Sequence, residues 1–133
     1  MTESTILTDE ARRLLSGGHP AHVATLLPDG SPHSVPMWVG LEGDRVTILT
    51  SPSSRKAANL ERDPRVAVSV VDRANPLVSV LVRGRMAERI EGDPAWEIID
   101  RMSDAYIGMP YGPRVDRVVY AIEPERVRVV VIG

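Results

Sequence analysis

A short run of serines and cations, residues 51–56, has the composition of an anion-binding site. It reads Ser-Pro-Ser-Ser-Arg-Lys and stands between a β-branched stretch and a helical one. Unpaired N–H groups and the helix dipole favour phosphate at such a strand-to-helix junction. The serine hydroxyls add neutral donors, Arg55 adds a planar fork and Lys56 adds a point charge. We predict a phosphate site here; the alternative is an ordinary helix cap with exposed cations.

Lys56 differs from every other basic residue of the chain. Of the 16 basic residues, 15 are arginine and Lys56 is the single lysine. A bias toward arginine has replaced lysine at all other basic positions. Either Lys56 remained by chance, or its site needs a compact point charge rather than a guanidinium fork.

Residues 35–38, Val-Pro-Met-Trp, have an unusual composition for a strand. Pro36 removes a donor from the hydrogen-bond ladder, which indicates an edge strand or a bulge. Met37 and Trp38 offer flat, polarizable apolar surface of the kind that contacts a ring system. The alternative is that Trp38 is an ordinary core tryptophan.

The remaining reactive residue types argue against several kinds of site. His19, His22 and His33 lie in or beside the first predicted hairpin, with no acidic or cysteine partner at ligand spacing, so we expect no metal site. The chain has no cysteine, which excludes a thiolate nucleophile and fits a reducing compartment. No Ser-His-Asp arrangement, dinucleotide-binding glycine motif or Walker motif is present. The sequence therefore names no catalytic side chain.

Length and charge place the chain in a broad class. Its 133 residues suffice for one domain, and a net charge of −2 argues against nucleic acid or anionic lipid as a partner. No apolar run approaches the roughly 20 residues of a membrane-spanning helix. The first residues lack the basic and apolar regions of a signal peptide. We expect a single cytoplasmic domain over residues 1–133, without membrane or nucleic-acid partners.

The elements that must position these residues are short strands with three helices between them. One helix is capped by Thr8 and ends at Gly17, a second is capped by Ser54, and a third begins at Asp93 as N-cap. A bulge or bend is expected at Gly84. The predicted strands are residues 22–27, 33–41, 45–51, 65–72, 77–91, 117–122 and 127–132.

Seven short strands with tight loops favour a closed or nearly closed antiparallel barrel. Residues 66–71 and 127–132 are apolar at nearly every position, so both faces of these strands require burial. The few helices of the chain are not enough to cover them. We therefore expect a symmetric homodimer that packs barrel against barrel.

Taken in order, these segments resemble the pyridoxamine-5′-phosphate-oxidase-like split-barrel superfamily. The matching residues are 24–26, 29–38, 48–51, 54–60, 63–66 and 82–86. The compact length and the Pro-Met-Trp strand are most similar to the actinobacterial branch that uses the deazaflavin coenzyme F420. The resemblance implies an FMN-binding-type split β-barrel, mainly antiparallel β with Greek-key connections and short helices, and a homodimer with a cofactor site at each interface.

The same resemblance assigns roles to particular residues. The cofactor phosphate is expected at Arg55 and Lys56. The ring is expected against residues 35–38, with the long strand near Ser79 also approaching it. The expected cofactor-binding residues are Val35, Pro36, Met37, Trp38, Thr50, Ser51, Ser54, Arg55, Lys56 and Ser79. Pyridoxamine phosphate oxidases carry a C-terminal extension that this sequence, ending at Gly133, does not show, so oxidation of a pyridoxal precursor is not expected.

The expected function is hydride transfer between F420 and a small, planar conjugated molecule. In such an enzyme the cofactor carries the hydride, and the protein supplies orientation and a dry pocket. Three alternatives stay open: an FMN-binding flavoprotein of the same fold, a carrier or sensor that binds cofactor without turnover, and a structural dimer that binds none.

Overall fold

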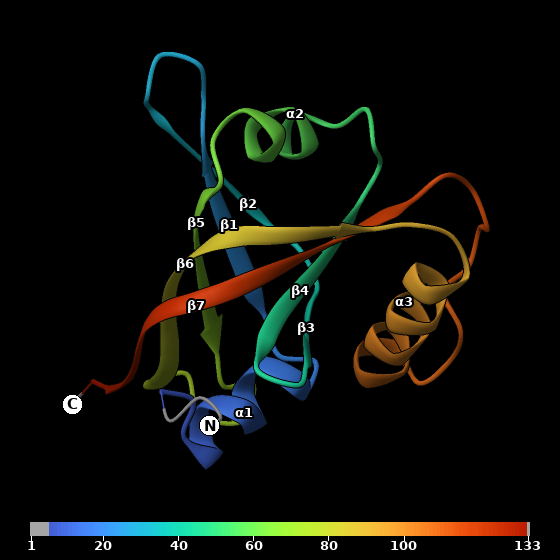
Figure 1. Ribbon diagram of the computed structural model, residues 1–133. Coiled ribbons are helices and arrows are strands. Elements are labelled where there is room, and N and C mark those ends of the chain that lie inside the picture. Colours follow the sequence, from blue (N-terminus) through green and yellow to red (C-terminus); the bar gives the residue numbers. More distant parts are fainter. Residues whose placement is uncertain (1–5, 133) are drawn as a thin grey trace.

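The computed structural model describes residues 6–132, which form one seven-stranded antiparallel sheet and three helices. The sheet has the order β2-β1-β5-β6-β7-β4-β3 and curls into a barrel (Figure 1). The strands are β1 Ala21–Leu26, β2 Pro32–Pro36, β3 Val39–Glu42, β4 Arg45–Thr50, β5 Arg65–Val71, β6 Val78–Ile90 and β7 Val118–Val131. The helices are α1 Asp9–Ser16, α2 Arg55–Arg62 and α3 Gly92–Ile107. The predicted fold class, a mainly antiparallel split barrel with short helices, is confirmed.

The barrel is split between β2 and β3, the two edges of the sheet. The prediction of one strand over residues 33–41 is wrong, because this segment forms both edges with Met37 and Trp38 between them. Pro36 ends β2 opposite His22 of β1, since its ring nitrogen carries no hydrogen to donate. The Met37 N–H still donates to the carbonyl of Ala21 in β1 at 3.0 Å, and the chain then leaves β1 and joins β4 at Val39. Two consecutive residues thus connect opposite edges of the sheet.

The two longest strands, β6 and β7, form the centre of the sheet. The predicted break between residues 122 and 127 is wrong, because β7 is continuous from Val118 to Val131. Pro124 is tolerated inside β7 because it lies opposite Gly84, where the register shifts. The predicted bulge at Gly84 is confirmed. A Cβ atom there would lie 2.2 Å from the carbonyl oxygen of Glu123, so only glycine allows this approach.

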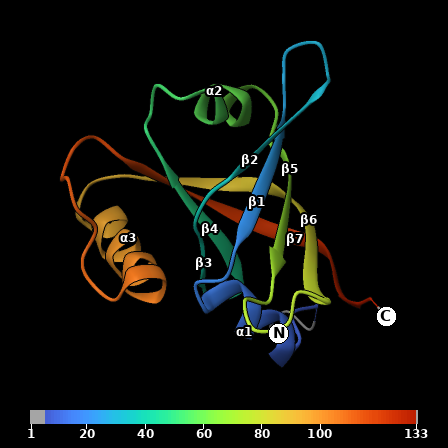
Figure 2. The same ribbon diagram turned by 180° about the vertical axis from the view of Figure 1, so that it is seen from behind.

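Three helices close the barrel at its ends and on one side. In both views, α1 lies at one end of the barrel, α2 at the other, and α3 stands to one side (Figures 1 and 2). The caps predicted at Thr8 and Ser54 are confirmed, since each side chain accepts an N–H bond from its own helix. The cap predicted at Asp93 is wrong. The N-cap of α3 is Glu91, and Asp93 lies in the first turn instead.

The core has two parts. The larger fills the barrel with aliphatic side chains, and the smaller lies between α3 and the sheet. Trp96, predicted to be a core residue, packs against the smaller part but stays half-buried, with the guanidinium of Arg114 4.2 Å from the centre of its ring. No helix within residues 6–132 is long and apolar enough to cross a membrane. Residues 1–5, on which the expectation of no signal peptide rests, lie outside the described part.

Candidate cofactor-binding site

The turn between β4 and α2 brings together three of the predicted phosphate-site residues. The hydroxyl of Thr50, at the end of β4, donates to the hydroxyl oxygen of Ser54 over 2.8 Å. That oxygen also accepts from the Ala57 N–H at 3.1 Å, and the Ser54 N–H donates to the carbonyl of Ser51 at 3.0 Å. Thr50 is buried, so it fixes the turn from inside the protein. The start of α2 is therefore held in one geometry.

The first turn of α2 carries positive charges, which are unfavourable at the N-terminus of a helix. A helix N-terminus favours acidic residues, and α1 and α3 both have them there. In contrast, α2 has no acid in its first turn and begins with Arg55 and Lys56. Within residues 6–132 neither cation forms an ion pair, and neither of their backbone N–H groups has an acceptor. A bound anion would correct both deficits, so these residues fit a phosphate.

Trp38 lies in the link between the two sheet edges and is held by α3. Its ring stacks on Tyr106 with 5.0 Å between the ring centres and 5° between the planes. The Tyr106 hydroxyl accepts from the Val39 N–H at 3.2 Å and donates to the carbonyl of His19 at 2.7 Å. Burial raises the pKa of Tyr106. Trp38 is thus a positioned, half-buried ring rather than a fully buried core residue.

A hollow of about 380 Å³ opens beside the Trp38 ring. Three of the predicted ring residues, Pro36, Met37 and Trp38, line it, and so does Tyr106, which the sequence reasoning did not name. Tyr106 follows Ile99 and Met102 at helical spacing on the face of α3 that packs on the sheet, and this pattern was the signal for it. The remaining lining comes from Pro20, Ala21, His22 and Arg73.

The structure does not gather all predicted site residues at this hollow. Val35 is half-buried on β2 just before Pro36, but Thr50, Ser51, Ser54, Arg55 and Lys56 lie at the turn before α2 and do not line it. Ser79 lies on β6, paired with Val71 and Val130, and does not line it either. One copy of the chain therefore presents the phosphate residues, the ring residues and Ser79 at separate places.

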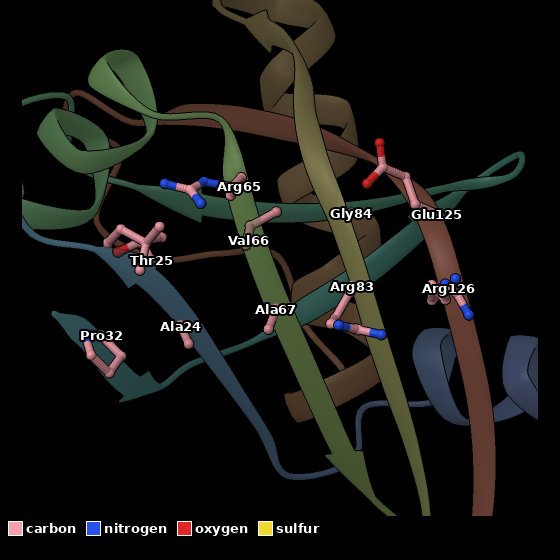
Figure 3. A pocket seen from close by; sticks show the side chains of 11 residues that line it. Ala24, Thr25, Pro32, Arg65, Val66, Ala67, Arg83, Gly84, Glu125 and Arg126 are labelled. Carbon is pink, nitrogen blue, oxygen red and sulfur yellow. The ribbon is translucent and has the colours of Figure 1, made fainter. Parts of the chain in front are cut away.

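Two further hollows, of about 510 and 640 Å³, adjoin on the outer face of the sheet. They share four lining residues, Ala24, Ala67, Arg83 and Arg126, of which Figure 3 shows the side chains. The sequence reasoning missed this region. The sequence offered only a partial signal, Arg83 on the predicted strand 77–91; Arg126 falls outside the predicted strand 127–132, so its place opposite Arg83 could not be predicted.

No group of three or more histidine, aspartate or glutamate side chains within residues 6–132 is arranged to hold a metal ion. A half-exposed polar network at the end of α2 is structural. Tyr120 donates to Glu61 at 2.9 Å, and Arg89 does the same at 2.9 Å. Burial, together with the Glu61 bond, raises the pKa of Tyr120 to about 12. This network joins the last turn of α2 to β6 and β7.

Comparison with known proteins relates the chain to cofactor-dependent reductases. It is 34% identical over 128 residues to an F420H(2)-dependent biliverdin reductase of Mycobacterium tuberculosis, covering 93% of this chain and 88% of that protein. A solved structure of an F420 reductase superposes with a TM-score of 0.76 at 29% identity, over 88% of this chain and 94% of the other. A heme binding protein of Mycobacterium smegmatis gives a TM-score of 0.70 at 26% identity, over 98% of this chain and 55% of the other.

The family is shown by a match over nearly the whole chain. The model of the pyridoxamine 5′-phosphate oxidase family matches residues 7–131, which include every strand and helix described above. The order of the sheet and the superpositions agree with this match. The chain therefore belongs to the pyridoxamine 5′-phosphate oxidase family of split β-barrels.

Proposed function

We propose that this protein is an F420-dependent oxidoreductase that reduces a small, planar conjugated molecule. The observation that carries the proposal is the first turn of α2, where two cations and two unpaired N–H groups form a ready anion site. Relatives named for F420 support the choice of cofactor. When bound, the deazaflavin supplies a hydride, and the protein binds and orients both reactants.

In this proposal each predicted segment binds one part of the cofactor. Arg55 and Lys56 hold the phosphate, while Thr50, Ser51 and Ser54 fix the turn that presents them. The ring lies against Val35, Pro36, Met37 and Trp38. Tyr106 holds the Trp38 ring in place, so the surface offered to the cofactor is rigid before binding. The separate positions of these segments indicate that one chain alone forms an incomplete site.

We propose a homodimer that completes the site, with Ser79 contributed from the second copy. Exposed apolar side chains at the start of β6 and the end of β7, on the same face as Ser79, support this: Leu77, Leu81 and Ile132. These ends of β6 and β7 lie on the side of the barrel away from α3 (Figure 1). The expected location is the cytoplasm, because a chain without cysteine suits a reducing compartment.

Biliverdin is the first acceptor to test. One relative is named for reduction of biliverdin and another for binding heme, and both molecules are flat conjugated tetrapyrroles. A molecule of this shape can stack on the face of the cofactor ring, which is proposed to lie in the open hollow beside the stacked Trp-Tyr pair.

The test has two arms. The purified protein is titrated with oxidised F420 and, separately, with FMN, and binding is followed by tryptophan fluorescence. Reduced F420 and biliverdin are then mixed with the protein without oxygen, and the recovery of oxidised F420 absorbance is measured. F420 binding with turnover supports the proposal. FMN binding alone indicates a flavoprotein, F420 binding without turnover of any acceptor indicates a carrier, and binding of neither indicates a structural dimer.

A further inference from the structure

The two adjoining hollows on the outer face of the sheet are large enough for a flat molecule, and small side chains of the sheet form their base, or floor. Their volumes, about 510 and 640 Å³, lie within the roughly 300–1,000 Å³ of small-molecule sites. Ala24 and Ala67 occupy adjacent strands in the shared region, and Ser69 extends it along β5. These small side chains leave the surface of the sheet open to an approaching ring system.

Arginines stand at one side of this floor in an arrangement that costs stability. Arg83 of β6 and Arg126 of β7 are direct partners in the strand register, and Arg128 follows two residues later on the same face. Like charges directly opposite one another in a sheet repel. In Figure 3 the side chain of Arg83 extends toward β7, where Arg126 lies. The repulsion would be relieved by an anion bound between them.

No carboxylate of the described chain neutralises these arginines. Within residues 6–132, Arg83, Arg126 and Arg128 form no ion pair and no side-chain hydrogen bond. Arg85, two residues from Arg83 on the same strand, does pair with Glu125 at 3.8 Å. We call the three unpaired arginines the arginine face. A guanidinium fork matches a carboxylate in two parallel hydrogen bonds, so this face is suited to carboxylates.

We infer that the arginine face binds the carboxylates of the acceptor and makes the enzyme selective for flat conjugated molecules that carry two of them, as biliverdin does. This inference rests on the proposed function. The position of the arginine face agrees with this inference, because the larger hollow reaches the hollow beside Trp38: His22 lines both. An acceptor held at the arginine face therefore extends its conjugated system toward residues 36–38, where the cofactor ring is proposed to lie.

The experiment compares biliverdin with its dimethyl ester, which has the same ring system and no carboxylates. Binding of each is measured by absorbance to the full chain with oxidised F420 present, for the wild type, Arg83→Gln, Arg126→Gln and a double variant as control. Arg85→Gln removes the same charge from the same strand at a position that already has a partner. Because it frees Glu125, which lines the smaller hollow, the matched control combines Arg85→Gln with Glu125→Gln. Thermal unfolding of each variant checks the fold, and removal of one opposed charge is not expected to lower stability.

The wild type should bind the acid about ten- to a hundredfold more tightly than the ester, the factor of one charge-assisted hydrogen bond. Arg83→Gln and Arg126→Gln should lose most of this preference and bind the ester as the wild type does. The double variant should keep the preference. F420 affinity should be equal in all four proteins.

Several outcomes would overturn the inference. Equal binding of acid and ester by the wild type would show that carboxylates are not recognised. If Arg126→Gln weakened the binding of acid and ester equally, Arg126 would shape the site without recognising carboxylates. A loss of F420 affinity in either variant would assign the arginines to the cofactor. A loss of dimer in Arg126→Gln would assign them to a second copy. F420 binding without any biliverdin binding overturns this inference and leaves the choice of cofactor standing, whereas absence of F420 binding removes the proposed function itself.

Discussion

At the scale of single residues, Lys56 is the most informative position. Lys56→Ala should weaken F420 binding by roughly ten- to a hundredfold, because it removes one charge-assisted bond worth about 1.5–3 kcal/mol. The fold should persist, since Lys56 forms no ion pair within the described residues. Titration by tryptophan fluorescence measures the affinity. A deazaflavin analogue without the phosphate should bind the variant and the wild type alike, and equal loss for both ligands would refute the phosphate assignment.

Trp38 is the second residue whose role can be measured alone. F420 binding should quench its emission, because the proposed ring site lies beside it. Trp96→Phe leaves Trp38 as the only tryptophan and should preserve the quenching, whereas Trp38→Phe should abolish it. Both rings contact Tyr111, so the two variants are matched in their surroundings. If quenching survives only in Trp38→Phe, the ring lies elsewhere.

At the scale of elements, the crossing of β6 and β7 at Gly84 should be intolerant of any side chain. Gly84→Ala places a Cβ atom 2.2 Å from a backbone oxygen of β7, so the strands must move apart. We expect a loss of about 1–3 kcal/mol in the free energy of unfolding, as for other overpacked sites. Urea denaturation measures it. Gly112→Ala is the control, since a Cβ atom there meets nothing within 4 Å, and equal stability of both variants would contradict the account.

The contact between α1 and the end of β5 should make stability depend on pH. Asp72 accepts from Arg13 at 2.8 Å and from the Ala74 N–H at 2.9 Å, and the Arg13 bond lowers its pKa below the ordinary value of 3.8. A lowered carboxyl pKa stabilises the fold above the unfolded-state pKa, and this contribution is lost as the pH falls through the folded-state pKa. Melting temperatures between neutral and acid pH should therefore fall less steeply in Asp72→Asn. Asp116→Asn is the control, because the side chain of Asp116 has no partner within residues 6–132. Its melting temperature should fall with pH as steeply as that of the wild type.

At the scale of the whole molecule, the prediction is a dimer through the apolar ends of β6 and β7. Sedimentation at micromolar concentration should give a species of twice the 14.6 kDa chain mass. Ile132→Asp should shift it toward monomer, because the side chain of Ile132 is 60% exposed in one chain and a buried charge is costly. Ile107→Asp places the same charge on α3, at a side chain 52% exposed, and should leave the dimer intact. A wild-type monomer would refute the dimer.

The sequence by itself determined the local elements. Caps at Thr8 and Ser54, the bulge at Gly84 and the strands near them follow from residue types whose backbone preferences act over a few residues. Residue types also marked out the turn before α2 and the Pro-Met-Trp segment. The phosphate and ring roles given to them stay predictions.

Only the tertiary structure decided how the elements combine. The split of residues 33–41 into two sheet edges and the continuity of β7 through Pro124 both depend on partners far along the chain, His22 and Gly84. The same is true of the Trp38–Tyr106 stack and of the opposed pair Arg83 and Arg126. Strand register sets which side chains face one another, and register is fixed by the packing of the whole sheet rather than by any local pattern.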